Sequence, residues 1–283
     1  MGKSVTIASE VTALRSHVNR WRRDGHTTAI VPTMGGLHDG HLSLVKKAQT
    51  KADFVAVSIF VNPTQFAEGE DFSTYPGDLD EDLQKLEACG ANLAYVPNAG
   101  EMYPDGFSTT VHVNGPAMAG LEDKFRPHFF DGVATVVAKL LIQAQCDYAI
   151  FGEKDYQQLA VVTQLTNDLN IPTQIIGSKT IRETSGLAMS SRNAYLSETE
   201  RARAALIYEC LEAAAKDIRA DKNIADTMSK ARTKLTENGY KVDYVEARNA
   251  KDLSEVKSSD AGPLRLLCAA WLGKTRLIDN IAV

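Results

Sequence analysis

The stretch VPTMGGLHDGH at residues 31–41 constrains the fold of this chain more than any other. It follows an apolar run that begins at Thr27, and a helical pattern starts at Gly40, which predicts a strand, a glycine loop and a helix N-terminus. Gly35 and Gly36 let the backbone turn and approach a ligand closely, and the unpaired N–H groups of a first helical turn favour an anion. The stretch therefore predicts a phosphate-binding site.

Two histidines in this stretch are placed to contact the same anion. His38 and His41 are three residues apart, so they share a face if the helix begins near them. A Walker-type loop is excluded because His41 and Leu42 follow Gly40, where that motif needs a Lys and then a Ser or Thr. Two alternatives stay open: a metal site, for which no third ligand stands nearby, and an ordinary loop without a ligand.

The residues that follow the glycine loop complete a β-α-β unit. Apolar positions at helical spacing lead into a near-continuous apolar run of strand length at 54–61. Parallel strands that are buried on both faces read as unbroken apolar runs, and the crossover between them is almost always right-handed. The pattern therefore predicts that the glycine loop lies at the C-terminal edge of a parallel sheet.

The rest of the chain predicts further elements of this kind and then changes in composition. Apolar spacing predicts helices at 9–24, 79–88 and 133–144, and a loop that leads into a helix at 152–159. Short apolar runs between turn residues predict strands at 27–32, 92–96, 148–151 and 173–177. Residues 109–113 are expected to form either a strand or an excursion. Later residues predict helices at 198–218 and 223–238 and strands at 241–248 and 264–272, which indicates a smaller α+β domain. We place the boundary within 183–193, giving domains at 1–185 and 186–283.

Charge, cysteine usage and hydropathy limit the class of protein. The net charge of −5 and the pI near 5.7 argue against a nucleic-acid-binding surface. The cysteines are widely spaced without a C-x-x-C pair, which indicates reduced thiols in a cytoplasmic protein. No signal peptide is evident, and the most apolar long stretch, 132–144, contains Lys139 and is too short to span a bilayer. We therefore expect no nucleic acid and no membrane as a partner.

A lysine and two glutamines follow the predicted strand at 148–151. The segment FGEKDYQQL places Lys154 after that strand and Gln157 and Gln158 on the first turn of a helix, where a cation and amide donors suit a carboxylate or a phosphate. A solvated helix start explains the same residues equally well.

Two other loops follow predicted strands and carry polar groups. MSSRN at 189–193 supplies two hydroxyls and a guanidinium, which suit the outer phosphates of a nucleotide, although such residues also make ordinary turns. Gln65 lies on the loop after the strand at 54–61. In an open parallel sheet the C-terminal ends of the strands converge on one crevice, so these loops are expected to meet the glycine loop.

Five ordered motifs connect the chain with one enzyme family. They are VPTMGGLHDGH at 31–41, SIFVNPTQF at 58–66, FGEKDYQQL at 151–159, GLAMSSRN at 186–193 and AAWLGKTRLIDN at 269–280. With these motifs the sequence resembles the pantothenate synthetases, also called pantoate–β-alanine ligases, over nearly its whole length. This family belongs to the nucleotidyltransferases related to class I aminoacyl-tRNA synthetases, in which the His-x-x-His loop corresponds to the HIGH-type motif and the Ser-Ser-Arg segment to the KMSKS-type loop.

The resemblance implies a fold and a reaction. The fold would be α/β, a Rossmann-like doubly wound parallel sheet with a smaller C-terminal α+β domain as a lid and 178–193 as its hinge. The reaction would use ATP and Mg²⁺: (R)-pantoate attacks the α-phosphorus to give a pantoyl adenylate and pyrophosphate, and β-alanine then attacks the activated carbonyl to give pantothenate and AMP. The family forms homodimers, which implies a homodimer here.

The matching motifs imply roles for individual residues. ATP would lie against Met34, Gly35, Gly36, Leu37, His38, Asp39, Gly40, His41, Gly152, Glu153, Lys154, Asp155, Ile181, Met189, Ser190, Ser191 and Arg192. His38, His41 and Lys154 would act at the phosphates as the catalytic residues, with His41 as the proposed proton donor. Gln65 and Gln158 would bind pantoate, and Gln65 would also lie near β-alanine. The resemblance assigns no protein side chain as a metal ligand.

Two positions depart from the family pattern. Phe129 stands where the family commonly has the histidine of Arg-Pro-Gly-His-Phe, and Gly77 stands where an arginine often follows Tyr-Pro. Other functions stay open as alternatives: another adenylyl-forming enzyme on this fold, or a nucleotide-binding sensor that has lost turnover. The intact histidines, lysine and arginine of the motifs argue against a sensor, and the short acidic chain argues against an aminoacyl-tRNA synthetase.

Overall fold

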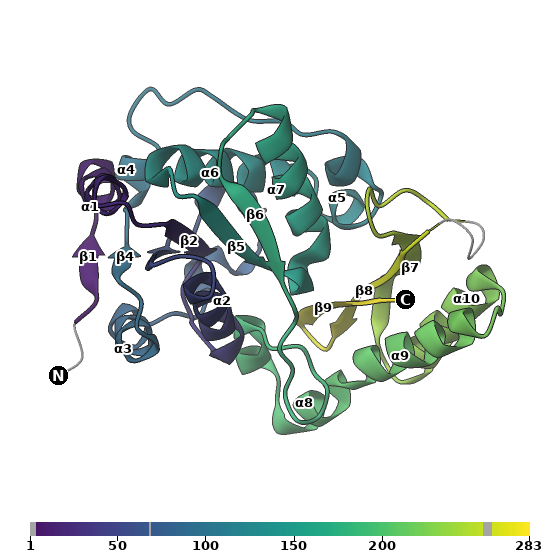
Figure 1. Ribbon diagram of the computed structural model, residues 1–283. Coiled ribbons are helices and arrows are strands. Elements are labelled where there is room, and N and C mark those ends of the chain that lie inside the picture. The colour runs from purple at the N-terminus through teal and green to yellow at the C-terminus, as the bar shows by residue number, and fades with distance from the viewer. Residues whose placement is uncertain (1–3, 68, 257–261) are drawn as a thin grey trace.

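Six parallel strands form the central sheet, in the spatial order β1-β4-β3-β2-β5-β6 (Figure 1). The structure is a computed structural model and describes residues 4–67, 69–256 and 262–283. The strands are β1 (Thr6–Ala8), β2 (Thr28–Thr33), β3 (Phe54–Ile59), β4 (Leu93–Tyr95), β5 (Tyr148–Gly152) and β6 (Gln174–Ser178). The three central strands β3, β2 and β5 are largely buried, as expected for parallel strands that are covered on both faces.

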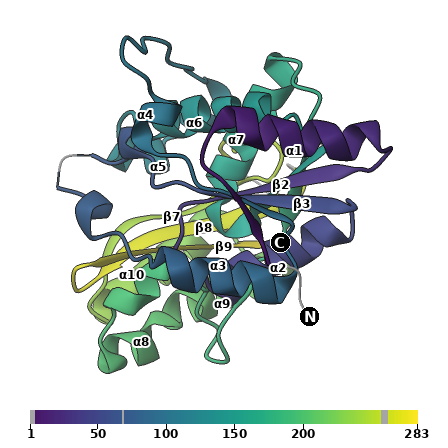
Figure 2. The same cartoon turned by 90° about the vertical axis from the view of Figure 1, so that its left-hand side faces the viewer.

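Helices cover both faces of this sheet (Figures 1 and 2). One face carries α1 (Val11–Arg23), α6 (Phe129–Ala144) and α7 (Tyr156–Asp168), and the other carries α2 (Asp39–Gln49) and α3 (Leu79–Cys89). The apolar positions of α1 recur at helical spacing, so Leu14, Val18 and Trp21 are all buried. α3 closes at Gly90, whose φ of 78° is the left-handed conformation that ends many helices. The predicted doubly wound α/β fold is confirmed.

The order of the strands reverses at β2, which places a crevice beside its C-terminal end. From β2 the chain adds β3 and β4 on one side, and it then returns to add β5 and β6 on the other side. In open α/β sheets, ligands bind at such a switch point, outside the C-terminal ends of the strands. The glycine loop follows β2, and the 3₁₀ turn η4 (Glu153–Asp155) follows β5, so two predicted anion-binding segments meet at this crevice.

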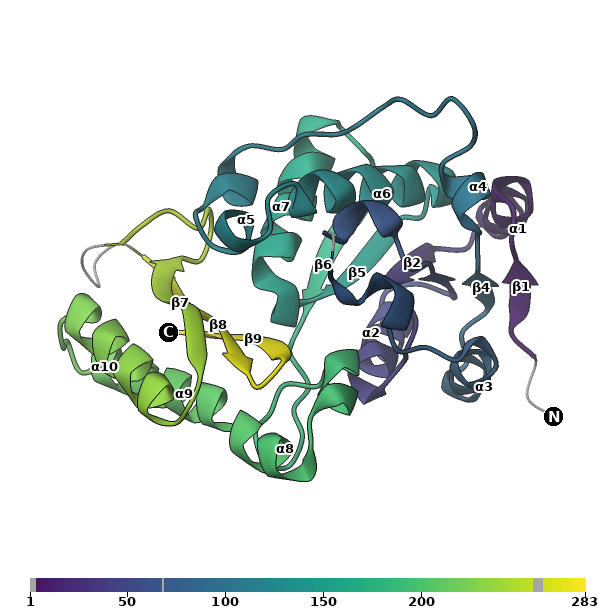
Figure 3. The ribbon, with the colours of Figure 1, turned by 180° about the vertical axis from the view of Figure 1, so that it is seen from behind.

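A smaller antiparallel sheet follows, in the order β7-β8-β9. Its strands are β7 (Lys241–Asn249), β8 (Leu264–Leu272) and β9 (Thr275–Ala282), and the helices before it are α8 (Glu198–Ala204), α9 (Leu206–Arg219) and α10 (Ile224–Glu237). One face of the sheet packs on α9 and α10. The opposite face is turned toward α7 of the first part of the chain (Figure 3). On this face, Tyr244 and Leu267 pack with Leu121 and Tyr156. The small sheet is therefore held between its own helices and the central domain.

Short helical turns complete the connections. They are α4 (Ala99–Met102), α5 (Glu122–Phe125), η1 (Pro63–Gln65), η2 (Asp71–Thr74), η3 (Gly115–Met118) and η5 (Ser191–Tyr195). Among the described residues, no helix has both the length and the apolar character needed to cross a membrane.

Some elements differ from those predicted from the sequence. The prediction omits β1, which has only three residues, two of them exposed, and β9, in which buried polar and charged residues interrupt the apolar pattern. Residues 109–113 form no strand, because the Val111 N–H donates to the Thr135 hydroxyl of α6 instead of to a neighbouring strand. The single helix predicted at 198–218 is divided at Ala205 into α8 and α9.

Two neighbouring residues of α6 offer a test of the core between this helix and the sheet. Leu141 is 1% exposed and Ile142 is 49% exposed. We expect Leu141→Ala to lower the free energy of unfolding by about 2–5 kcal/mol, because it leaves a cavity, and Ile142→Ala to lower it by less than about 1 kcal/mol. Urea denaturation of both variants measures the difference, and equal losses would contradict this packing.

Candidate active site

Two side chains of α3 hold the glycine loop between β2 and α2. The Asp82 carboxylate accepts the N–H of Gly36 at 2.9 Å and the N–H of Leu37 at 2.7 Å, while Lys85 Nζ donates to the Leu37 carbonyl at 2.7 Å. A side chain at Gly36, whose φ is 62°, would overlap the carbonyl oxygen of Pro76. A carboxylate of the chain itself therefore occupies the N–H groups of Gly36 and Leu37, which lie before the first turn of α2.

The two histidines lie together at the N-terminus of α2. Their ring centroids are 4.1 Å apart. The Gly40 N–H donates to His38 Nδ1 at 3.1 Å, and the His38 N–H donates to His41 Nδ1 at 3.4 Å. Because Nδ1 accepts in both rings, a neutral ring carries its proton on Nε2. Each histidine can therefore donate one hydrogen bond to a ligand while its other nitrogen holds the helix start.

The environment keeps both histidines neutral at neutral pH. Burial, followed by the nearby Lys154 ammonium, lowers the pKa of His38 to about 4. Burial, followed by His38 and Lys154, lowers the pKa of His41 to about 3. Among the described residues, no group of three or more His, Cys, Asp or Glu side chains is arranged to hold a metal ion. Neutral imidazoles offer one N–H donor each and no charge, so the positive charge of the site comes from Lys and Arg.

Two adjoining cavities lie at the C-terminal edge of the central sheet. The smaller, of about 200 Å³, is lined by both histidines and by predicted residues from every strand-end segment. The larger, of about 610 Å³, extends between the central domain and the small sheet. Residues that line both cavities are Met34, Gln65, Lys154, Asp155, Gln158, Ser190 and Arg192.

Most of the residues predicted for ATP line the smaller cavity, and some do not. Those that line it are Met34, His38, Gly40, His41, Gly152, Lys154, Asp155, Ile181, Met189, Ser190, Ser191 and Arg192. Those that line neither cavity are Gly35, Gly36, Leu37, Asp39 and Glu153. Leu37 is 2% exposed and packs in the hydrophobic core, so its side chain supports the loop and does not face the cavity.

Two glutamines present amide groups to the junction of the cavities. Asn62 Nδ2 donates to Gln65 Oε1 at 3.1 Å, which turns Gln65 Nε2 toward the Met34 sulfur at 3.2 Å. A thioether is a weak acceptor, so an oxygen of a ligand would be a stronger partner for Nε2. Within the described part of the chain, the Gln158 amide makes no hydrogen bond. Gln157 is buried and bonded to three protein groups, so it supports the structure.

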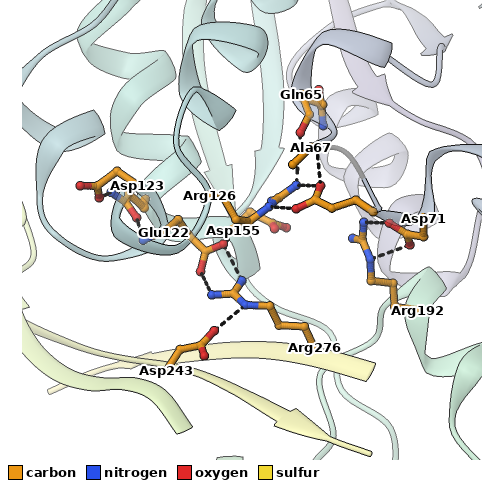
Figure 4. Close-up of polar contacts among 12 residues, drawn as sticks. Gln65, Ala67, Asp71, Glu122, Asp123, Arg126, Asp155, Arg192, Asp243 and Arg276 are labelled. Carbon is orange, nitrogen blue, oxygen red and sulfur yellow. Dashed lines mark hydrogen bonds and ion pairs between the residues drawn. The ribbon is translucent and has the colours of Figure 1, made fainter. Parts of the chain in front are cut away.

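The segment at the start of η5 docks onto the glycine loop. The Ser191 hydroxyl donates to the Gly36 carbonyl at 3.1 Å. Arg192 binds Asp71 of η2 through Nε at 2.9 Å and Nη2 at 2.8 Å (Figure 4). Its Nη1 group has no hydrogen-bond partner among residues 4–67, 69–256 and 262–283. Asp71 therefore orients the guanidinium and leaves donors available toward the cavity, which Ser190 and Arg192 both line.

An alternating chain of acids and arginines crosses the wall of the larger cavity (Figure 4). Glu122 accepts from Arg276 Nη1 at 2.7 Å and Nη2 at 2.9 Å, and Arg276 Nε donates to Asp243 at 2.8 Å. Arg126, at the C-terminal end of α5, binds Glu70 with two bonds of 2.7 Å. Sequence reasoning missed these partners and also Asp82, because single charged residues far apart in the chain form no motif.

Comparison with known proteins gives a match over nearly the whole chain. The sequence model of the family described as Pantoate-beta-alanine ligase matches residues 6–282. The chain belongs to this family. It is 52% identical over 283 residues to the pantothenate synthetase of Bradyrhizobium sp. strain BTAi1, with 100% of both chains covered. It is 54% identical over 278 residues to the pantothenate synthetase of Mesorhizobium japonicum, covering 98% of this chain and 97% of the relative.

Solved structures of the family share the fold. The crystal structure of pantothenate synthetase from Thermus thermophilus has a TM-score of 0.92 at 40% identity, covering 98% of this chain and 99% of that chain. The pantoate-beta-alanine ligase of Francisella tularensis, complexed with Beta-gamma ATP and Beta-alanine, has a TM-score of 0.82 at 36% identity, covering 98% and 97%. The six-stranded parallel sheet and the small antiparallel sheet are therefore those of the family.

The lowered histidine pKa values predict a stability that depends on pH. The pKa of His41 in the folded state lies below its ordinary value of 6.5, so its contribution is fully present above pH 6.5 and is lost as the pH falls toward about 3. We expect the wild type to lose stability between pH 7 and pH 5, and His41→Gln to lose about 1–2 kcal/mol less over that range.

Urea denaturation at both pH values measures this effect. His26→Gln is the control, because the His26 side chain is 47% exposed and lies outside both cavities. The loss of stability between pH 7 and pH 5 should be smaller in His41→Gln than in this variant. An identical pH response of His41→Gln and wild type would show that His41 takes up a proton as readily in the folded protein as in the unfolded chain.

Proposed function

We propose that the protein condenses (R)-pantoate with β-alanine to form pantothenate, using ATP and releasing AMP and pyrophosphate. The observation that supports this proposal is that anion-binding donors and two glutamine amides meet at one crevice in a chain of this family. A set of anion-binding donors lines the smaller cavity, and two glutamine amides stand at its junction with the larger one. These groups support binding of a triphosphate in the smaller cavity and of a hydroxy acid at the junction.

In the first step, a carboxylate oxygen of pantoate forms a bond to the α-phosphorus of ATP, and the bond from that phosphorus to the bridging oxygen breaks to release pyrophosphate. Lys154, Arg192 and the Nε2–H groups of the two histidines would hold the phosphate oxygens, and Ser190 and Ser191 would add hydroxyl donors. Fixed donors aimed at developing charge in a site shielded from water are the usual main source of catalysis in such transfers.

Gln65 and Gln158 would bind pantoate next to the α-phosphate. The Gln65 amide is already oriented by Asn62, and Gln158 is free to turn, so both can bind the carboxylate or hydroxyl oxygens of the acid. A site built to bond a substrate hydroxyl rejects analogues that lack it, because buried polar groups are then left unpaired. This gives the two glutamines a role in selecting a hydroxy acid.

In the second step, the β-alanine nitrogen forms a bond to the pantoyl carbonyl carbon, the bond from that carbon to the adenylate oxygen breaks, and the amine loses a proton as AMP leaves. The ligase of Francisella tularensis is complexed with Beta-alanine together with Beta-gamma ATP, which supports binding of the amine and the nucleotide at the same time. We place β-alanine near Gln65, at the junction of the two cavities.

Mg²⁺ would enter with ATP as the magnesium complex of the nucleotide. This ion is usually held by substrate phosphates and one or two carboxylates, without a cage of protein ligands. The Asp155 carboxylate lines both cavities and its side chain is 46% exposed, so the donor set present is compatible with such a complex.

We also propose the domain roles and the assembly expected from the family. Residues 1–185 would bind the nucleotide and pantoate, and residues 186–283 would act as a lid that carries Ser190–Arg192 onto the phosphates. The docking of Ser191 on Gly36 supports a lid that closes over the glycine loop. A homodimer in the cytoplasm accords with the full-length similarity and with the free thiols of the four cysteines.

Release of pyrophosphate tests the activity. We expect the purified protein with ATP and Mg²⁺ to release pyrophosphate only when (R)-pantoate is present, and to reach multiple turnovers when β-alanine is added. Release without pantoate would favour another adenylylated substrate. No release from a folded sample that binds ATP would contradict the proposal and favour a nucleotide sensor.

Substitution of Lys154 tests the role of its charge. Lys154→Ala should lower kcat/KM for ATP on the order of 10²–10³-fold, because a fixed cation is lost where negative charge develops. Lys46→Ala removes an exposed ammonium from the last turn of α2 and should leave the kinetics unchanged. Steady-state kinetics of both variants measure this, and equal activity of the two would exclude Lys154 from the phosphate site.

A further inference from the structure

Asn280 of β9 bonds to the backbone of the turn that carries Lys154. Its Nδ2 group donates to the Glu153 carbonyl at 2.9 Å and to the Lys154 carbonyl at 2.7 Å. The residue is 3% exposed, so these bonds are shielded from water. A side chain from the last strand therefore fixes η4, although the two segments lie 126 residues apart.

Arg265 of β8 determines which way the Asn280 amide faces. Its Nε donates to Asn280 Oδ1 at 2.6 Å, and its Nη2 donates to Glu153 Oε2 at 3.1 Å. A guanidinium has only donors, so the amide oxygen must face Arg265 and the NH₂ group must face the two carbonyls. The Arg265 guanidinium also lies over the Tyr156 ring, 4.1 Å from its centroid, which holds the arginine in place.

Asp279, which precedes Asn280 in β9, binds a second segment that lines the smaller cavity. Because successive side chains of a strand point to opposite faces, Asp279 lies on the other face of the small sheet from Asn280. Asp279 accepts from Arg182 Nη1 at 2.6 Å and Nη2 at 2.9 Å. Arg182 lies in the bend closed by the bond from the Met189 N–H to the Ile181 carbonyl, at 3.0 Å, and Ser190–Arg192 follow that bend. Adjacent residues of β9 thus anchor two segments that line the smaller cavity.

Among the residues that the structure describes, the Lys154 side chain makes one ionic contact and no hydrogen bond. Its ammonium lies 3.7 Å from Asp155 Oδ2, and its side chain is 20% exposed. A four-carbon stem with one long ionic contact takes its position mainly from its backbone, and a misplacement of about 1 Å can cost on the order of 10²-fold in rate. The bonds from Asn280 to η4 therefore help to determine where the Lys154 ammonium lies.

We propose that Asn280 is a positioning residue for the ligase reaction, which fixes Lys154 at the ATP phosphates through the carbonyls of Glu153 and Lys154. The inference rests on the proposed function. Lys154 follows β5 of the central sheet, whereas Asn280 lies on β9 of the small C-terminal sheet. By this proposal, the small sheet helps to build the phosphate site without supplying the lysine. Two variants isolate the bonds: Asn280→Ala removes the amide, and Asn280→Asp keeps the acceptor for Arg265 but replaces the donor with an oxygen that faces the two carbonyls.

Both Asn280 variants should lower kcat/KM for ATP by about 10- to 100-fold. Asn223→Ala is the matched control, because it removes an asparagine cap of α10, bonded to the Asp226 N–H at 3.0 Å, far from the cavities. It should lower the thermal unfolding midpoint without changing kcat/KM. If Asn280→Ala does not fold, Asn280→Asp alone carries the measurement. Wild-type kinetics in the folded Asn280 variants would overturn the proposal.

A double-mutant cycle separates positioning from general loss of structure. The dissociation constant of ATP is measured by calorimetry for wild type, Lys154→Ala, the folded Asn280 variant and the double variant. We expect the Asn280 substitution to weaken binding in the wild type and to have almost no effect after Lys154→Ala. Equal weakening in both backgrounds would overturn the proposal. Because this cycle needs no turnover, it stays informative if the wild type forms no pantothenate, an outcome that would count against the proposed function alone.

Discussion

The two hydrogen bonds from Gly36 and Leu37 to the Asp82 carboxylate are the constraint on which the rest of the crevice depends. They bend the chain directly after β2, so that α2 starts with its two histidines at the C-terminal edge of the sheet. The carbonyl of Gly36 then accepts the Ser191 hydroxyl. Gly36 thus connects the glycine loop with α3 through its N–H group and with Ser191 of η5 through its carbonyl. A close approach of Pro76 leaves no space for a side chain at that position.

Charge in the crevice is divided between two kinds of donor. Lys154 and Arg192 carry permanent positive charge, whereas burial keeps His38 and His41 neutral. Two protonated imidazoles with centroids 4.1 Å apart would repel each other and the lysine, so neutral rings let the donors pack closely.

Much of the fold and part of the site could be predicted from the sequence, because those parts depend on local patterns. The apolar runs of the central strands, the helical spacing of α1 and the closing Gly90 each reflect contacts within one element. The edge strand β1 has only three residues, and buried polar residues such as Asp279 and Asn280 interrupt the apolar pattern of β9. Both strands are therefore recognised only from their pairing with β4 and β8. Asp82 and Arg276 could not be found in this way, because their roles arise only when distant segments pack together.

The bonds from Asn280 to the Lys154 turn have a consequence for the synthesis of the protein. The last strand of the central sheet ends at Ser178, but η4 can form its hydrogen bonds with Asn280 only after residue 280 has been synthesised. At a translation rate of about 5–20 residues per second, the 126 residues between Lys154 and Asn280 take about 6 to 25 seconds. For part of that interval, all six strands of the central sheet have been made, while β7 and β8, which cover Leu121 and Tyr156, have not. A chaperone that shields this apolar surface would act on a chain that has every strand of the sheet but not the last residues of the crevice.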